Sequence, residues 1–395
     1  MDIVRLDPTT YLADGLVEGA SSKIWTERFA EAGDFQLTTG AIEQTRAFIP
    51  EGSLVSVRDS KEVMFVETHE VKRDDAGIPT LTTKGRTFET FAENRAAVGE
   101  YQKSWVPLKE YTTAELVSYL LWTYLVNATG QDPSRAGEGI GTQSAIPGVV
   151  VTDSTTVVEA VKEWTLQAGN VYQQIRDFLS LGNLGVRTIR PPGTSGKVVT
   201  FDTSGGGARG TVYKTDTAGI GQLRTDVYNG TDRTRMQSAV EPVIFHYASG
   251  HIDNPQYLFS TRDLKNVAHV SASVGNFFVW PGTGLTPPSV IPTGLARRIL
   301  YVDGGRMETG DDEDVFTASV VQKALIELSK HNRAAAFDGS VSAVSPFNYG
   351  EQYFLGDQVT LLGEYGLETS MTVSEYVRTE DHEGDRGFPT LILSN

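Results

Sequence analysis

The sequence YFLGDQVTL, residues 353–361, opens a β-rich stretch near the C-terminus, and GDFQL, residues 33–37, marks a matching stretch near the N-terminus. Each contains a glycine followed by an aspartate. Glycine can take backbone conformations denied to other residues where a strand starts, and an aspartate side chain can bond to the amides of a turn. The two ends therefore predict similar strand-built modules, which we expect to be paired β-barrels.

Short apolar runs separated by turn residues fill the first hundred residues. Strands are expected at 23–30, 35–39, 54–58, 63–72 and 80–84. Asp74 to Gly77 predicts a hairpin connection, because Asp and Gly tolerate the positive φ angles of tight turns. Residues 1–100 are therefore predicted to form a small antiparallel barrel or sandwich.

The hydrophobic period changes after Tyr111. Thr112 and Glu115 have the spacing of a capping box, and apolar residues then recur at helical spacing up to Asn127. Two further helices are predicted at 157–168 and 171–181, followed by a hinge rich in Pro and Gly at 191–196. Strand character resumes at 197–202, residues 276–293 are expected to be a loop, and 316–333 predicts one more helix.

Length and composition limit the class of protein. With 395 residues the chain is too long for one ordinary core and suggests two to four domains. No apolar run approaches the roughly 20 residues of a membrane span, and Met1 to Leu6 lacks the features of a secretory signal, so we expect neither membrane anchoring nor export by a signal peptide. The absence of cysteine excludes disulfides, cysteine-ligated metals and thiol nucleophiles.

The formal net charge is −16. Binding to phosphate relies on clustered Lys and Arg that release counterions, so this charge argues against broad attraction to DNA, RNA or anionic lipid. It is typical of a soluble protein, and it also allows an acidic wall past which a polyanion slides without sticking.

No catalytic, cofactor-binding or metal-binding constellation stands out. The acidic run 311–314 is better placed for helix capping than for calcium, and Gly205 to Gly210 lacks the Gly-Lys-Ser/Thr of a phosphate loop. The six histidines never form an H-E-x-x-H arrangement. A carboxylate pair for glycoside cleavage depends on a separation of about 5 to 9 Å, which sequence does not reveal.

Tryptophans are the remaining candidates for ligand contact. Trp122 and Trp164 lie in apolar patterns and are expected in the core, whereas Trp280, beside Pro281 and Gly282, is the candidate for an exposed contact surface.

Four motifs in order along the chain resemble one known family. They are Trp25 with Phe29 and residues 33–37, residues 66–87 ending in Gly85-Arg86-Thr87, residues 228–234, and residues 355–359. Together these are similar to the minor tail proteins that form the baseplate or tail-tip hub of long-tailed siphophages infecting Gram-positive, particularly actinobacterial, hosts. The structural signature comprises Trp25, Gly33, Phe35, Gly85, Arg86, Asp232, Arg233, Gly356 and Asp357.

The resemblance implies an α+β fold with two β-barrel, tail-tube-like domains and mixed α/β inserted domains. The first hub barrel is assigned to 1–100 and a helix-bearing mixed domain to 101–195. The second barrel is expected from 196–245 together with 335–395. An inserted mixed domain, 246–334, contains the loop 276–293 and the helix 316–333.

The same resemblance implies a structural virion protein rather than an enzyme, with no cofactor. Three copies would form a hub that connects the tail tube to tip or fibre proteins. Its expected neighbours are a distal tail or tube protein, the tape measure protein, and DNA that passes without specific binding. Synthesis and assembly are expected in the host cytoplasm. The alternative is a tail-tip module that binds host cell-wall carbohydrate, through Trp280 and the surrounding loop.

Overall fold

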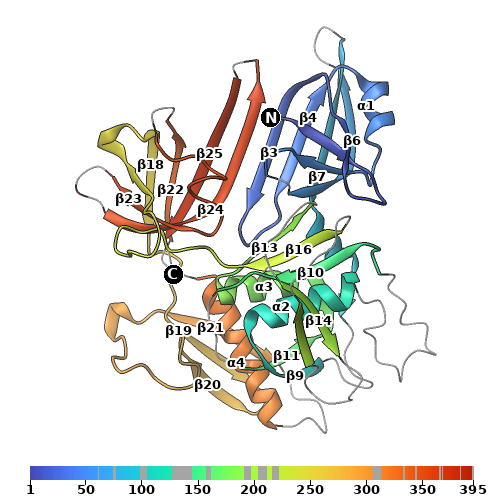
Figure 1. Cartoon of the computed structure of the whole chain (residues 1–395). Helices are drawn as coiled ribbons and strands as arrows, with labels where there is room; N and C mark the ends of the chain where they lie inside the picture. The colour runs from blue at the N-terminus through green and yellow to red at the C-terminus, as the bar shows by residue number, and fades with distance from the viewer. Residues whose placement is uncertain are drawn as a thin grey trace, which may run out of the picture.

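The computed structural model describes residues 1–60, 62–73, 77–97, 105–126, 145–156, 162–190, 197–202, 211–215, 222–305, 313–331, 334–342, 345–363, 366, 368–382 and 384–393. The hinge at 191–196, the glycines at 205–210, Asp311 and Asp312, and most of the hairpin connection 74–77 lie outside these ranges. Within them the chain is mostly β, with strands from both ends above a helix-bearing layer (Figure 1).

The first ninety residues form the N-terminal β unit. Its strands are β1 (Ile3–Leu6), β2 (Ala13–Leu16), β3 (Ala20–Arg28), β4 (Asp34–Thr39), β5 (Leu54–Val57), β6 (Val63–Arg73) and β7 (Pro79–Thr87), with helix α1 (Ile42–Phe48). In β4 the side chains of Phe35, Leu37 and Thr39 are buried and those between them are not, as expected for a strand with one face on a core. The expected strands of this region and the antiparallel β6–β7 hairpin are confirmed.

The C-terminal β unit is built from two separated parts of the chain. Its strands are β17 (Ile244–His246), β18 (Ile252–Ser260), β22 (Ala334–Val341), β23 (Gln358–Leu362), β24 (Glu368–Asp381) and β25 (Gly384–Leu393). They enclose a core that includes Phe245, Tyr353 and Val373.

The two β units share one sheet. Strand β3 pairs antiparallel with β24, and the path runs β18-β22-β25-β24-β3-β4-β7-β6-β5-β1-β2, with β17 and β23 attached beside β24. Arg28 of β3 bonds to Glu375 of β24 at 2.6 Å and to Asp34 at 2.6 Å, so ion pairs reinforce the seam. Among the described strands this path ends at β18 and β2, and neither unit closes on itself as a separate barrel.

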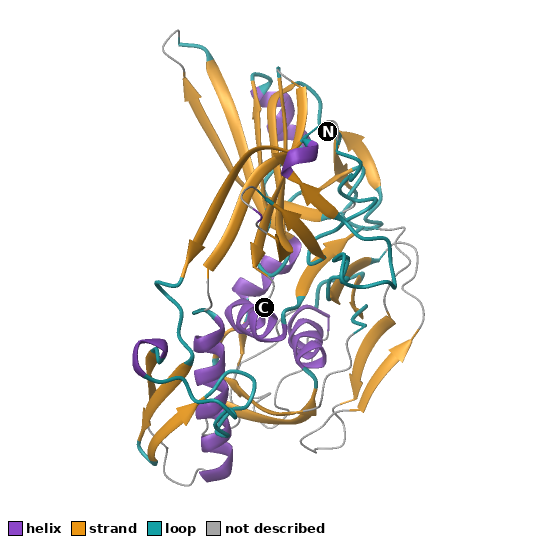
Figure 2. Cartoon of the chain, turned by 90° about the vertical axis from the view of Figure 1, so that its left-hand side faces the viewer, coloured by secondary structure: helices purple, strands orange, loops and turns teal. Residues whose placement is uncertain are grey.

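The helical unit lies beneath this sheet (Figure 2). A five-stranded sheet of order β13-β16-β10-β14-β15 carries helices α2 (Thr113–Leu121) and α3 (Val171–Gly182). Its strands are β10 (Val149–Asp153), β13 (Gly185–Ile189), β14 (Lys197–Asp202), β15 (Thr211–Thr215) and β16 (Leu223–Tyr228). The expected capping box is present: Glu115 N donates to Thr112 Oγ1 and Thr112 N donates to Glu115 Oε2, both at 3.1 Å.

This pairing differs from the expected make-up of the second barrel. Strands β14, β15 and β16, within the stretch 196–245, hydrogen-bond to one another or to β10 and β13, and only β17 from that stretch pairs with β23 of the C-terminal unit. The difference arises because the partners of these strands, β10 and β13, belong to the helical unit, and the local sequence pattern does not determine which partner a strand takes. The C-terminal β unit instead gains β18, from the stretch expected to be inserted, which pairs with β22 of the expected range 335–395.

The helix expected at 157–168 is wrong for its described part. Residues Lys162–Gln167 form strand β11, antiparallel to β9 (Trp105–Tyr111). Trp164 Nε1 donates to the carbonyl of Tyr111 at 2.8 Å, and Trp164, Thr165 and Leu166 are all buried, so both faces of this strand are covered. The backbone on the open edge of β11 is satisfied by Gln322, whose amide bonds to both Thr165 N and Thr165 O.

The insert contains a three-stranded sheet and a long helix. Its strands are β19 (Val267–Ala272), β20 (Gly275–Val279) and β21 (Ile299–Gly305), and its helix is α4 (Glu313–Ser329). The helix expected at 316–333 is thus found at 313–329, and the expected loop 276–293 begins within β20. Strand β8 (Ala96–Ala97), which follows the N-terminal unit, pairs with β12 (Gly169–Asn170), and Ala97 belongs to the core of the helical unit.

Candidate functional site

Two of the sequence motifs, separated by more than a hundred residues, meet between the helical unit and the C-terminal β unit. A Cβ atom at Gly230 would lie 1.8 Å from the carbonyl oxygen of Gly356, and Gly356 itself has a φ of +86°. Only glycine allows this backbone approach. The neighbouring residues Asp232 and Gln358 form a parallel β-bridge. The motifs therefore act as one structural joint.

Asp357 closes this joint with its carboxylate. Its Oδ1 accepts from Thr231 N at 2.7 Å, and its Oδ2 accepts from Arg233 Nε at 2.7 Å and from Phe354 N at 3.1 Å. Burial raises the pKa of Asp357, while the bonds from Thr231 and Arg233 oppose that rise. Asp232 takes a smaller role, since its Oδ1 accepts from Thr234 N at 2.8 Å.

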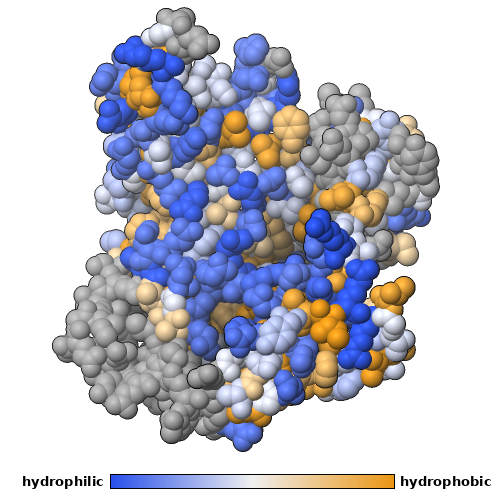
Figure 3. Space-filling view, turned by 180° about the vertical axis from the view of Figure 1, so that it is seen from behind, coloured by the Kyte–Doolittle hydropathy of each residue, from blue (hydrophilic) through white to orange (hydrophobic). Residues whose placement is uncertain are grey.

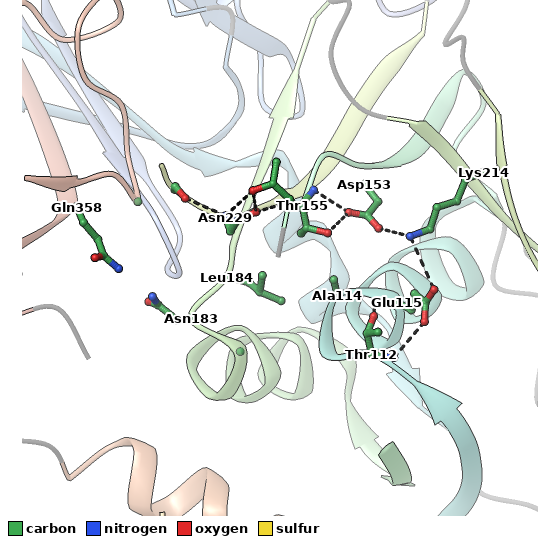
Figure 4. Close-up of a pocket in the computed structure, with 14 residues that line it drawn as sticks. Thr112, Ala114, Glu115, Asp153, Thr155, Asn183, Leu184, Lys214, Asn229 and Gln358 are labelled. Carbon is green, nitrogen blue, oxygen red and sulfur yellow. Dashed lines mark hydrogen bonds and ion pairs between the residues drawn. The ribbon is translucent and has the colours of Figure 1, made fainter. Parts of the chain in front are cut away.

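A cavity of about 460 Å³ opens beside the joint (Figure 4). Its lining combines the N-terminal end of α2, the end of α3 at Asn183, Lys214 and the Gly230–Gly356 contact. Lys214 Nζ lies 2.7 Å from Asp153 Oδ2 and 3.8 Å from Glu115 Oε1. Asp153 also accepts from the amide and hydroxyl of Thr155, so its carboxylate is already occupied.

This arrangement offers a positioned ion-pair network between Lys214, Asp153 and Glu115. Within the described ranges, no group of three or more His, Asp and Glu side chains could hold a metal ion. The chemistry of the cavity is that of a polar joint between two units.

The other signature residues lie in the N-terminal β unit. The rings of Trp25 and Phe35 stack with centroids 5.7 Å apart. A Cβ atom at Gly85 would lie 1.9 Å from the carbonyl oxygen of Phe65, and one at Gly33 would lie 2.4 Å from that of Thr26. These residues therefore define the packing of one core.

Arg86 lies at the edge of the same unit. Its guanidinium donates to both oxygens of Glu67 and of Glu93, at 2.8 to 2.9 Å, and these carboxylates raise the pKa of Arg86. The nine signature residues thus form two structural sets, one in the N-terminal β unit and one at the joint.

A cluster of buried carboxyl groups, which the sequence patterns did not indicate, lies where the β units meet the helical unit. Glu27, Glu62, Glu89 and Asp226 are all buried. Glu27 accepts from Trp25 Nε1 at 3.1 Å and from Tyr349 Oη at 2.6 Å. One weak sequence signal pointed to this cluster. Glu27 alternates with the apolar residues Trp25 and Phe29, so its carboxyl group is placed on the same buried face of the strand.

Burial raises the pKa of three carboxyl groups of this cluster, those of Glu62, Glu89 and Asp226. The pKa of Glu62 is raised well above its usual range by burial and by the charges of Glu27 and Glu89, against the opposing charge of Arg187. Burial also raises the pKa of Glu89 to about 7. A carboxyl group that cannot reach water favours its neutral form. Arg187 lies 3.4 Å from Asp226 and over the ring of Tyr228, and so supplies the compensating charge.

Trp280 is not exposed, which corrects the expectation for this residue. Only 4% of its surface is accessible, because a turn from Trp280 to Gly284 folds back on itself and the Arg297 guanidinium lies 5.7 Å from the ring centre. Trp122 and Trp164 lie in the core, as expected.

This architecture is that of phage tail proteins. Two solved structures align over nearly the whole chain. One is the 43 kDa tail protein of prophage MuSo2 from Shewanella oneidensis, at 14% identity and a TM-score of 0.51, covering 99% of this chain and 96% of that one. The other is a tail protein from Neisseria meningitidis MC58, at 11% identity and a TM-score of 0.50, covering 99% and 97%.

The family of the protein is identified from its amino-acid sequence. The family model of the Siphovirus ReqiPepy6 Gp37-like proteins matches residues 4–388, and the chain belongs to this family. No curated protein matches the chain. Among the described helices, none is both long enough and apolar enough to cross a membrane.

Proposed function

We propose that this protein is the structural hub subunit at the tip of a siphophage tail. Three copies form a collar that joins the tail tube to the tip or fibre proteins and surrounds the channel through which tape measure protein and DNA leave. The family and the fold of phage tail proteins support a structural role.

The observation that carries the proposal is the β3–β24 pairing. Six residue pairs, from Arg28 with Glu375 to Lys23 with Glu380, make one sheet from both β units. Two strand-built units fixed side by side give each protomer two similar arcs of a collar, and three protomers would supply six. Rotational closure of such a ring prevents open-ended growth and covers strand edges that would otherwise aggregate.

The charge fits passage of DNA without binding. Three copies would carry three times −16, a formal charge of −48. Duplex DNA carries one charge per about 1.7 Å, so acidic residues facing a channel would repel it within a screening length of about 8 Å. A basic lining of the assembled channel would contradict this part of the proposal.

The neighbours follow from the position in the tail. We propose a distal tail or tube protein above, tip or fibre proteins below, a Gram-positive and particularly actinobacterial host, and assembly in the host cytoplasm. The alternative, a module that binds host cell-wall carbohydrate, named Trp280 and the surrounding loop, and burial of Trp280 leaves only the loop as its contact surface.

The test measures the mass of the assembled protein and its location in the phage particle. Sedimentation of the purified protein, alone and with its neighbouring tail proteins, should give a species of three times 43.0 kDa. Antibody labelling of intact particles should mark the distal end of the tail tube. A chain that stays monomeric under both conditions, or a label elsewhere on the particle, would refute the hub.

A further inference from the structure

Two glutamates, Glu27 and Glu62, lie side by side in the protein interior. Charged side chains belong at a protein surface, and hydrophilic residues do cover much of the face seen in Figure 3. Glu27 and Glu62 are instead only 3% and 5% exposed. A hydrogen bond joins their two carboxyl groups. We call these two residues the carboxyl pair.

The hydrogen bond of the carboxyl pair requires a proton. Ionised carboxyl groups only accept hydrogen bonds, so one member of the pair must carry a proton and donate it to the other. Glu27 already accepts from Trp25 Nε1 at 3.1 Å and from Tyr349 Oη at 2.6 Å. Glu27 is therefore the acceptor of the pair, and Glu62 carries the proton.

The carboxyl pair lies where three units of the protein meet. Both of its glutamates belong to the N-terminal β unit, Glu27 in β3 and Glu62 directly before β6. The backbone of Glu62 forms an antiparallel bridge with Ile189 of β13, in the helical unit. Tyr349, which bonds to Glu27, stacks on Tyr376 of β24 in the C-terminal β unit, with ring centroids 3.8 Å apart. A change at the pair therefore reaches both neighbouring units.

Acidic groups outnumber basic groups around the pair. The charged and titratable groups that act on Glu62, or on Arg187 and Tyr349 beside it, are Glu27, Glu62 and Glu89, Asp226, Tyr228, Tyr349 and Arg187. Arg224 acts on Asp226 in turn, and Arg378 and Asp385 act on Tyr376. The four carboxyl groups of Glu27, Glu62, Glu89 and Asp226 thus share the guanidinium groups of Arg187 and Arg224. Ionising all four would leave negative charge without a compensating cation.

The folded protein holds the proton of Glu62 more tightly than the unfolded chain does. Burial raises the pKa of Glu62 well above its ordinary value of 4.5, and the charges of Glu27 and Glu89 raise it further. The stability that this proton gives is complete below pH 4.5 and is lost as the pH rises through the raised pKa. Ionised Glu62 would then place two carboxylates against each other away from water, which is costly unless water can enter.

We propose that the proton shared by Glu27 and Glu62 is a lock between the N-terminal β unit and the helical unit, and that its loss at raised pH opens their contact. The bridge between Glu62 and Ile189 is the part that opens, because it is formed by the backbone of the residue that gains the charge. Water entering there hydrates both carboxylates. The lock acts within one copy of the chain, so it does not depend on the proposed hub.

The experiment is hydrogen–deuterium exchange of the full-length protein, followed by mass spectrometry at several pH values between about 5 and about 9. Wild type is compared with Glu62→Gln, whose amide can donate the same hydrogen bond to Glu27 but cannot ionise. The matched control is Glu18→Gln, at an exposed position of the same β unit. Residues 185–190 report on the contact, since they contain β13 and have the same sequence in all three proteins. Circular dichroism establishes that the three proteins fold equally.

Residues 185–190 should exchange at the same rate in all three proteins at about pH 5. As the pH rises, they should exchange faster in wild type and in E18Q than in E62Q, by up to about tenfold per pH unit, the limit for release of one proton. Helix α4, which packs in a separate core, should show no such difference. Equal exchange of wild type and E62Q at every pH, a difference that grows toward acid, or an equal difference in α4 would overturn the lock.

A second variant tests the pair from its other side and keeps the proposal open to refutation if E62Q does not fold. In Glu27→Gln only one carboxyl group of the pair remains, and the new amide can donate to it, so the contact no longer requires a shared proton. Exchange of residues 185–190 in E27Q should therefore depend less on pH than in wild type. A dependence as steep as that of wild type would overturn the shared proton.

Discussion

Replacing Glu89 with Gln should make the protein more stable, and increasingly so as the pH rises. Glu89 is 1% exposed, and its Oε2 accepts a hydrogen bond from Thr188 Oγ1 at 3.2 Å. Glutamine copies the shape of the neutral carboxyl group and cannot ionise, so the substitution E89Q removes the cost of a buried charge.

The size of the effect follows from the pKa. Burial raises the pKa of Glu89 from 4.5 to about 7, and one pKa unit corresponds to about 1.4 kcal/mol. Because the folded state holds the proton more tightly than the unfolded chain, the stability contributed by neutral Glu89 is complete below pH 4.5 and is lost as the pH rises through 7. The advantage of E89Q over wild type should therefore grow by about 2.5 kcal/mol between about pH 5 and about pH 8.

The assay is urea denaturation followed by tryptophan fluorescence at several pH values. The substitution Glu51→Gln, at an exposed position of the same unit, serves as the matched control and should show no growing difference. An E89Q advantage that stays constant from about pH 5 to about pH 8, or that grows toward acid, would refute the argument that burial holds this proton.

Two further substitutions test the joint between the motifs. Gly230→Ala should destabilise the protein by about 3 kcal/mol or more and lower its melting temperature, because the new Cβ would overlap the carbonyl of Gly356. Asp357→Asn should cost about 3 kcal/mol in urea denaturation, because it leaves the half-buried Arg233 without its ionic partner.

Each of these two substitutions has a matched control substitution at another position of the same chain. Gly40→Ala adds a Cβ that meets nothing within 4 Å, and it should leave the melting temperature nearly unchanged. Glu368→Gln removes the partner of Arg235 in a more exposed ion pair and should cost less than about 1 kcal/mol. Equal losses in test and control variants would show that neither close packing nor burial explains the joint.

The sequence predicted features that depend on neighbouring residues in the chain. The strands of the N-terminal unit, the capping box at Thr112 and the helix before Asn183 all follow local periodicity or end signals. The sequence also singled out Gly33, Gly85 and Gly356 for the backbone conformations open to glycine. Gly356 has a positive φ as expected, whereas Gly33 and Gly85 do not and are required instead by a close approach of neighbouring backbone.

Features decided by distant partners were not predictable in this way. Strands β14 to β16 have ordinary strand patterns, and only β10 and β13 determine which sheet they join. The segment that forms β11 has an apolar pattern that suits a helix as well as a strand, and pairing with β9 decides between them. The buried carboxyl cluster arises where three units meet, so no single stretch of sequence contains its environment.

The seam between β3 and β24 sets the order of events during synthesis. Arg28 and Glu375 are separated by 347 residues, so the N-terminal strands leave the ribosome long before their partner exists. Contacts so distant along the chain form late and slowly, since a large loop must close first. Until then β3 keeps an unpaired edge, and a chain interrupted before residue 375 cannot complete the seam. A nascent or truncated product would thus lack the sheet that joins the two β units.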